Sequence, residues 1–350
     1  MDNGNGGQGV TKAQVIAMAM VILFQISIVP TPSMLDGPSD RMESSVSNQL
    51  ETYSLYLTTG NNLSTVLPSE GGQLEASALD TSLEFTTNVL MQSLQVVGDK
   101  RQTGGGSQYY IPLNIFLKAE GPQNSIVTWT FSLQAGGSTV ATGELENEAC
   151  SGFGGCDFEH EAIDVDLTGS GGSSSFTVSE SDELVLVIRA EMTGCGDGGF
   201  FNDCDARVAF NQISGDSRYS LIDIITNAVS DTVFFVQRPG DEFIDGAVVD
   251  WYPNDVISDR EMQFSFDVKS AFGRKDIESV ELRLRYTETN QLMLEKDLTP
   301  VPQQIEWTTE GLFGRFKWTY QSGLESGDYE AELRVTDVQS NVFTISHETI

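Results

Sequence analysis

The four cysteines of this sequence are the residues whose type and spacing point most directly to a chemistry. Cys150 and Cys156 are separated by five residues and Cys195 and Cys204 by eight, all in glycine-rich segments. An even number of cysteines in such loops is typical of disulfides formed in an oxidising compartment. We expect the local pairs, since each would close a loop without regular structure of its own. The alternatives are the other two connectivities or one zinc site of four thiolates, although no C-x-x-C spacing is present.

A second group of residues has the chemistry of a metal site. Asp197, Asp203 and Asp205 belong to the segment CGDGGFFNDCD. Clustered carboxylates in a turn offer the hard oxygen ligands that Ca²⁺ prefers, so calcium is the one cofactor to consider. The competing interpretation is a solvated acidic turn without a cofactor, because Asp favours turns in any case.

Three further residues are candidates for contacts at the surface. Phe200 and Phe201 are adjacent aromatic residues in the same loop, where they would form either an exposed binding patch or a plug at the end of the fold. Asn62 begins the one N-x-S/T sequon and lies in a polar segment, so it is the candidate glycosylation site.

Residues that would support catalysis are scarce. The sequence contains no G-x-S-x-G, H-E-x-x-H or G-x-x-x-x-G-K-[ST] motif. Its two histidines, His160 and His347, are expected to be solvated strand or loop residues. We therefore expect no enzymatic activity and name no catalytic residue.

The charge balance excludes two classes of partner. Among 350 residues there are 19 Lys and Arg and 51 Asp and Glu, a net charge of −32. Nucleic acids and anionic membrane surfaces are bound by basic patches, which such a chain lacks. Hydrophobic residues make up 39% of the chain, enough to build packed cores.

The N-terminal segment contains the one long apolar run. After a short tail, residues 1–12, the run Ala13–Val29 has 17 residues and no charge, at the lower limit for a membrane-spanning helix. It would be a signal-anchor helix, a cleaved signal peptide, or a pilin-type signal cut after Gly9. The lysine before the run weakly favours a cytoplasmic tail and an extracellular bulk. Residues 30–72 are polar and predict a stalk or linker, with a strand at Tyr53–Thr58.

Residues 73–227 predict a first β-sandwich domain. Short apolar runs alternate with glycine-rich turns, and no helical period is present. In the segment 128–133, TWTFSL, polar and apolar residues alternate, as expected for a strand with one buried face. The run 183–189, ELVLVIR, instead predicts a strand that is covered on both faces. Many short strands of this kind indicate an antiparallel sandwich.

Residues 228–350 predict a second all-β domain. Val280, Leu282, Leu284 and Tyr286 fall on one face of a strand, and the opposite face carries charges that would be solvated or paired across strands. Aromatic residues at positions 316, 318 and 320 share one face of a later strand, which indicates a core. The alternative interpretation is an exposed row of aromatic rings that stacks on sugar rings.

The closing segment of this domain carries a family resemblance. GLESGDYEAELRVTDVQSN, Gly323–Asn341, resembles the last strands of immunoglobulin-like domains in exported bacterial and archaeal surface proteins, where G-x-Y leads into a strand that ends in V-x-D-x-x-x-N. DVKSAFGRKDIESVELRLRY, Asp267–Tyr286, is similar to their middle strands. The resemblance covers about 110 residues and implies an immunoglobulin-like sandwich. The first domain is similar to larger sandwiches of such proteins.

Together these features predict an all-β chain with two antiparallel β-sandwich domains, the second immunoglobulin-like, after an N-terminal hydrophobic helix. We expect a non-enzymatic cell-surface or secreted protein with a structural, adhesive or ligand-binding role. Its partners would be the cell envelope, other surface proteins or glycans, with the membrane reached through the N-terminal helix. The alternatives are a pilin-like filament subunit and a binding module of an extracellular carbohydrate-active enzyme.

Overall fold

The computed structural model describes most of the chain after residue 44. The described ranges are 45–46, 49–68, 72–103, 106–151, 156–168, 173–195, 204–211, 218–237, 261–300, 304–319 and 327–349. The expected tail and apolar helix, residues 1–29, lie outside them. The described residues form strands, turns and one short 3-10 helix, η2 (Arg274–Asp276), without any α-helix, so the prediction of an all-β chain is confirmed. None of them forms a helix long and apolar enough to cross a membrane.

The first part of the fold is built from fourteen strands, numbered β2 to β15. They are β2 (Glu51–Thr58), β3 (Asn62–Ser64), β4 (Leu74–Ser77), β5 (Ser82–Thr86), β6 (Leu94–Val97), β7 (Asp99–Thr103), β8 (Gly106–Glu120), β9 (Ile126–Ala135), β10 (Ser138–Glu148), β11 (Glu159–Leu167), β12 (Ser175–Val178), β13 (Leu184–Met192), β14 (Asp205–Phe210) and β15 (Leu221–Thr226). The strand expected at residues 53–58 is β2, which pairs along its length with β15. The folded part of the chain therefore includes residues that we expected to belong to a linker.

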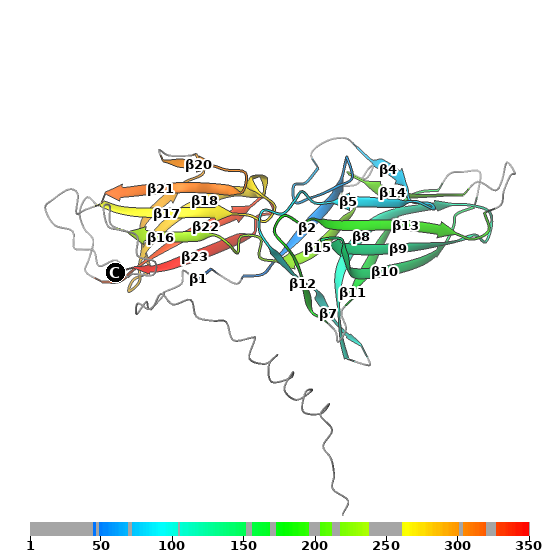
Figure 1. The fold of residues 1–350 in the computed structure, drawn as a ribbon, viewed down its shortest axis with the longest axis horizontal. Coiled ribbons are helices and arrows are strands. Elements are labelled where there is room, and N and C mark those ends of the chain that lie inside the picture. The colour runs from blue at the N-terminus through cyan, green and yellow to red at the C-terminus, as the bar shows by residue number, and fades with distance from the viewer. Residues whose placement is uncertain are drawn as a thin grey trace, which may run out of the picture. The chain divides into compact units, whose positions relative to one another are not determined.

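Nine of these strands close into a ring, shown in blue to green in Figure 1. Their hydrogen-bonded order is β15-β2-β3-β5-β13-β9-β10-β11-β8, and a pairing between β8 and β15 completes it. All pairs are antiparallel except β3 with β5, which share one parallel pair. A closed ring has no free edges, in contrast to the open two-sheet sandwich that the strand pattern predicted.

Alternation along each strand fills the interior of this ring. In β9, Val127, Trp129, Phe131 and Leu133 are buried, and the residues between them are at least partly exposed. The apolar run in β13 differs from our expectation of two covered faces. Its even-numbered residues are fully buried, whereas Val185 and Val187 lie on the outer face and remain partly accessible.

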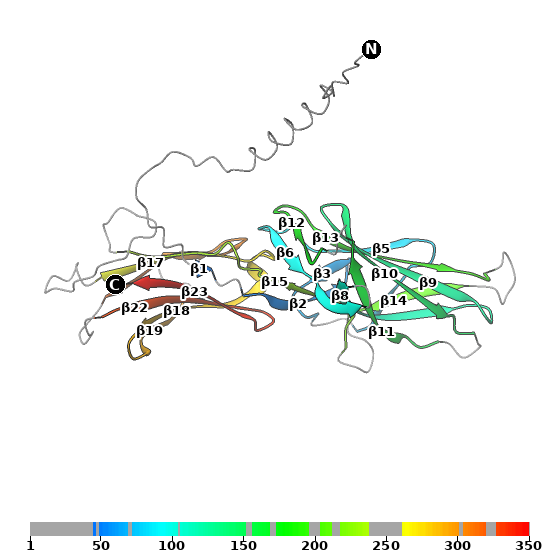
Figure 2. The same ribbon diagram turned by 90° about the horizontal axis from the view of Figure 1, so that it is seen from below.

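The second part of the fold has two sheets. Its strands are β1 (Ser45–Val46), β16 (Val233–Gln237), β17 (Glu261–Lys269), β18 (Ile277–Tyr286), β19 (Gln291–Asp297), β20 (Ile305–Trp307), β21 (Gly311–Thr319), β22 (Tyr329–Asp337) and β23 (Val342–Thr349). One sheet has the order β1-β23-β22-β18-β19 and the other β16-β17-β21-β20. Figure 2 shows β17 in one layer and β18, β19 and β22 in the other. Apolar side chains of both sheets are buried between them.

Charged residues on the outer face of β18 pair across strands, as its sequence predicted. Arg283 lies 2.9 Å from Glu295 of β19, and Arg285 lies 3.1 Å from Glu332 of β22. These pairs are partly exposed, so they specify the register of neighbouring strands more than they stabilise the fold.

The turn Asp337–Asn341 joins the two parts of the fold. The Gln339 side chain donates to the carbonyl oxygens of Ser54 and Thr65, at 2.7 and 2.8 Å, and accepts the Ser54 backbone N–H at 2.9 Å. Asn341 donates to the Thr52 carbonyl at 3.3 Å. The V-x-D-x-x-x-N segment therefore ends in a turn that binds strand β2 by its side-chain amides.

Two buried carboxyl groups lie at this junction, Asp276 and Asp337, each about 1% exposed. Asp337 accepts hydrogen bonds from the backbone N–H groups of Gln339 and Asn341, both at 2.8 Å. Burial raises the pKa of Asp276 to about 6, with a further contribution from the charge of Asp337. Burial and the same two carboxyl groups raise the pKa of Tyr53 well above its ordinary value.

Candidate functional site

The candidate site lies at one open end of the nine-stranded ring, where β10 and β11 separate. These strands pair at two positions only, Ala141 with Leu167 and Thr142 with Asp166. Beyond them β10 continues along β9 and β11 continues along β8, so the two strands diverge and leave a hollow between them. We call this hollow the mouth. Ligand sites are common in the mouths of β-barrels, because the strands hold side chains around a space that no strand fills.

The mouth has an apolar floor and a polar rim, and its cavity volume is about 40 Å³. Leu117, Val127 and Trp129 form the floor and are almost completely buried. The rim residues are Lys118, Asn147, Glu148, Asp157, Glu159 and Glu161. The alternation that buries Ile163 and Val165 of β11 places Glu159 and Glu161 on the same, inward face.

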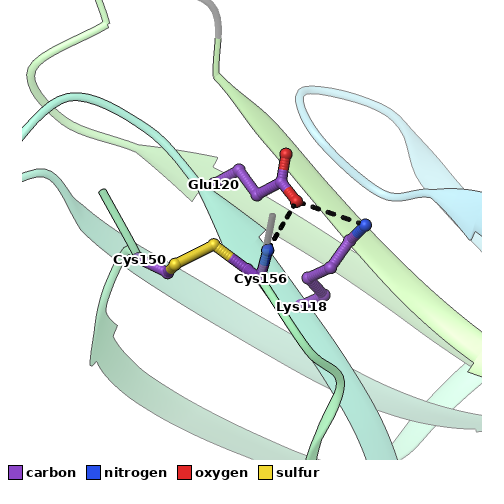
Figure 3. The surroundings of a disulfide bond; sticks show 4 residues. All are labelled: Lys118, Glu120, Cys150 and Cys156. Atoms are coloured by element: carbon purple, nitrogen blue, oxygen red, sulfur yellow. Dashed lines mark hydrogen bonds and ion pairs between the residues drawn. A yellow bond between two sulfur atoms is a disulfide. The ribbon is translucent and has the colours of Figure 1, made fainter. Parts of the chain in front are cut away.

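Hydrogen bonds fix part of this rim. Asn147 Nδ2 donates to Glu161 Oε1 at 3.2 Å and bridges the diverging strands. On the other side, Glu120 Oε1 accepts the Cys156 backbone N–H and lies 3.3 Å from Lys118 Nζ, as Figure 3 shows. The Lys118 ammonium also lies 5.2 Å from the centre of the Phe158 ring.

Both disulfides lie beside the end of β8, and one of them, Cys150–Cys156, lines the mouth. The pairs are Cys150–Cys156 and Cys195–Cys204, so the expected local pairing is confirmed. The Cys150 backbone bonds to residues 119 and 121, and Cys150 and Cys156 line the mouth. On the opposite side of β8, a Cβ atom on Gly121 would lie 3.4 Å from Cys204 Sγ. One cysteine of each disulfide, Cys150 or Cys204, therefore lies beside the same strand end.

The arrangement limits what the mouth can bind. Four of its six polar side chains are carboxylates, and the single cation, Lys118, is engaged by Glu120. The rim therefore repels anions and offers acceptors to amino, hydroxyl or guanidinium groups. Trp129 is only 1% exposed, so its ring supports the floor and is not available to stack on a sugar.

Of the candidate metal and binding residues singled out in the sequence, four lie outside the described residues: Asp197, Phe200, Phe201 and Asp203. Asp205 begins β14 and pairs with Arg207. Among the residues that the structure describes, no group of three or more His, Cys, Asp or Glu side chains is arranged to hold a metal ion. Asn62 begins β3, is exposed, and donates its side-chain N–H to the Thr59 carbonyl.

The two histidines and the aromatic row are also placed. His160 is exposed on β11 and packs beside Phe116 of β8, with ring centres 5.0 Å apart. His347 belongs to β23. Phe316 and Trp318 are partly buried and pack against the core, as the alternation predicted, and Tyr320 lies outside the described residues. The sequence did not single out the mouth, because its rim residues come from separate strands and carry no motif.

Removal of the Cys150–Cys156 disulfide gives the first testable prediction. We expect Cys150→Ser combined with Cys156→Ser to lower the free energy of unfolding by about 2–3 kcal/mol, because the opened loop regains conformational freedom in the unfolded chain. Urea unfolding followed by tryptophan fluorescence measures this change. Ser151→Ala, in the same loop, is the control and should unfold like the wild type. Equal stability of the double variant and the wild type would contradict the prediction.

Comparisons with known proteins find similarity at the level of solved structures only. No family model and no curated protein matches the chain. A CocE/NonD family hydrolase from Staphylococcus aureus is 10% identical with a TM-score of 0.33, over 51% of this chain and 36% of that one. An α-amino acid ester hydrolase is 11% identical, with a TM-score of 0.31 over 50% and 36% of the two chains. A β-glucuronidase from Parabacteroides merdae is 10% identical, with a TM-score of 0.23 over 75% and 34%.

In these alignments the chain spans about a third of the length of the proteins it matches. At such identities and TM-scores the similarities assign neither a family nor an activity to the chain.

Proposed function

We propose that this chain is a non-enzymatic, exported surface protein that binds a partner of the cell envelope through the mouth of its first domain. The two disulfides beside the end of β8 are the observation that carries the proposal. Disulfides persist in oxidising compartments, and one of these two lines the polar hollow. The net charge of −32 also suits a protein that must stay soluble in a salty exterior.

In this proposal, the two-sheet part of the fold that follows the nine-stranded ring is an immunoglobulin-like sandwich. The two-sheet arrangement of β16–β23 and the closing turn at residues 337–341 support that assignment. The chain would be held at the membrane by a single N-terminal helix with the bulk outside, or released after cleavage. Its partner would be a surface protein or glycan whose amino or hydroxyl groups meet the acidic rim.

The location is tested by the mature N-terminus of the native protein, determined by mass spectrometry in fractionated cells. An intact Met1 in the membrane fraction, or a cut after residue 29 in the medium, is the expected result. A cut after Gly9 would replace the proposal by a filament subunit. A reduced chain in the cytosol would overturn it.

Binding through the mouth is tested by charge reversal on its rim. Residues 30–350, which lack the proposed membrane helix, should co-sediment with isolated cell envelopes, and Glu161→Lys should weaken this association at least about tenfold, because it reverses a rim charge and removes the acceptor of Asn147. Glu146→Lys is the matched control: it makes the same charge change on β10, where Glu146 is exposed and points away from the interior. Equal loss in both variants would indicate a general charge effect and contradict a role of the mouth.

A further inference from the structure

A buried oxygen-rich cluster lies between the two parts of the fold, remote in sequence from the mouth. Asp276 comes from η2 and Asp337 from the end of β22, while Tyr53 of β2 and Thr65 beyond β3 come from the first part. All four are at most 6% exposed. Asp276 interacts with Asp337 and with the side chain of Thr65, and Tyr53 interacts with both carboxyl groups. We call these four residues the junction cluster.

Two oxygen atoms of the junction cluster are buried and have no hydrogen-bond partner. They are Oδ1 of Asp276 and the hydroxyl oxygen of Tyr53. The second carboxylate oxygen of Asp276 accepts from Ser270 Oγ at 2.6 Å. The Tyr53 hydroxyl lies near Asp337 without a hydrogen bond of normal geometry. Buried polar atoms are nearly always satisfied in folded proteins, so two orphans in one place point to a missing partner.

No positive side chain fills this role in the described part of the chain. The nearest arginine along the chain, Arg274, donates to the Ile277 carbonyl and lies over the Trp307 ring. Two carboxylates that share a buried position repel each other unless a positive charge lies between them.

The hydrogen bonds that the two carboxylates already make leave some of their oxygen atoms able to accept from, or bind, a positive ion. Asp337 uses Oδ1 for two backbone N–H groups and Oδ2 for Asn341 Nδ2 at 2.9 Å, so Oδ2 keeps one acceptor position. Asp276 Oδ1 makes no hydrogen bond of normal geometry. Tyr53 adds a neutral oxygen. The free acceptors are all hard oxygen atoms, and they come from both parts of the fold.

We propose that the junction cluster is a calcium site that joins the two parts of the fold, with Asp276, Asp337 and Tyr53 as its ligands. A divalent ion balances two carboxylates, whereas a monovalent ion would leave one negative charge buried. Ca²⁺ accepts carboxylate, hydroxyl and carbonyl oxygens in flexible geometries, which suits a site assembled from two sheets. The site is separate from the loop at Asp197–Asp205, which the sequence offered for the same ion.

Calcium binding by the full-length chain tests this site. Calorimetric titration with CaCl₂ at pH 7.5, after removal of metal by a chelator, should show one equivalent that Asp276→Asn abolishes. At a calcium concentration 100 times the dissociation constant, the melting temperature of the wild type should rise by roughly 5 °C. That rise should be absent in Asp276→Asn, since the amide removes a charged ligand and keeps the shape of the side chain.

Two control variants separate this site from other acidic positions. Asp223→Asn changes a half-buried carboxyl group that, like Asp276, accepts from a serine hydroxyl, here Ser54 Oγ at 2.6 Å, but lies outside the junction cluster. Asp203→Asn changes the loop. Both variants should still bind one equivalent of calcium, and calcium should still raise their melting temperature. If Asp203→Asn abolished calcium binding and Asp276→Asn did not, the ion would be assigned to the loop at Asp197–Asp205 and the proposal would be overturned.

A second measurement covers the case in which Asp276→Asn does not fold. Tb³⁺ replaces Ca²⁺ in oxygen sites and emits when a nearby tyrosine absorbs, so the first equivalent of Tb³⁺ should give emission that falls several-fold in Tyr53→Phe. Unchanged emission would overturn the proposal. The proposal would also be overturned if the melting temperature of the wild type changed with pH but not with calcium. In that case the carboxyl groups of Asp276 and Asp337, which lie beside Tyr53 and Glu51, would share a proton instead of an ion.

Discussion

Gly311→Ala is expected to destabilise the protein by about 3 kcal/mol or more. The substitution removes no interaction, and the whole effect comes from the clash of the added methyl group. Gly311 begins β21 and pairs with Lys269 of β17. A Cβ atom at this position would lie 2.9 Å from the Val268 carbonyl carbon and 3.0 Å from Ile277 Cδ1, and closer still to the Val268 oxygen. The atoms that the new methyl group would meet belong mainly to the backbone of β17, which is held by hydrogen bonds to β21 and cannot move aside as a side chain would. Urea unfolding of the full-length chain measures the loss.

Gly143→Ala is the matched control for this prediction. Gly143 also lies within a strand, β10, but a Cβ atom there would meet its nearest neighbours at 3.4–3.5 Å, which is ordinary contact. Alanine reduces the freedom of the unfolded chain, so we expect a change within about 1 kcal/mol and of either sign. If both variants lost stability equally, the clash at Gly311 would not be the cause.

Trp129→Ala is expected to lower the free energy of unfolding by about 3–5 kcal/mol, because it leaves a large cavity in the ring. Trp129 is 1% exposed and lies opposite Leu145 of β10 and Ala190 of β13. Proteins of this kind are stable by about 5–15 kcal/mol in total, so the variant would lose a large fraction of its stability. Urea unfolding followed by circular dichroism is the measurement, since the variant has lost a fluorescent residue.

The conservative variant Trp129→Phe separates the two roles of this residue. It keeps an aromatic ring in the core and should lose less stability than Trp129→Ala, while the floor of the mouth becomes deeper. Envelope binding that survives in Trp129→Phe but not in Glu161→Lys would show that the rim, and not the floor, makes the contact. A stability of Trp129→Ala within 1 kcal/mol of the wild type would contradict its assignment to the core.

The mouth and the junction cluster are both polar positions inside an apolar fold, and they differ in how they are satisfied. In the mouth, Asn147 and Glu161 bond to each other and are open to water. In the junction cluster, Asp276 Oδ1 and the Tyr53 hydroxyl oxygen are buried and have no hydrogen-bond partner among the protein atoms. An open polar site fits the recognition of an external partner, whereas a closed one fits an ion that becomes part of the structure.

Several features of the fold follow from short-range patterns alone. Alternation in TWTFSL predicts β9, and charges on the reverse of residues 280–286 predict the cross-strand pairs of β18. The cysteines are close enough along the chain to pair locally. The polar composition of residues 30–72, in contrast, assigned the strand at Tyr53–Thr58 to a linker, whereas β2 is part of the ring: its Tyr53, Leu55 and Leu57 are fully buried, and mostly polar residues occupy its other face.

The sequence by itself determined the class of this protein: an acidic, all-β chain in which most predicted strands bury one face, with cysteines spaced for local pairing. Periodicity reports which face of a strand is buried, because that depends on neighbours one or two residues away. It does not report which strand lies beside it. The closure of the ring by β8 and β15, the divergence of β10 and β11 into a mouth, and the meeting of Tyr53 with Asp276 and Asp337 were decided by the tertiary structure. These contacts join residues up to nearly 300 positions apart, and only the register of paired strands brings them together.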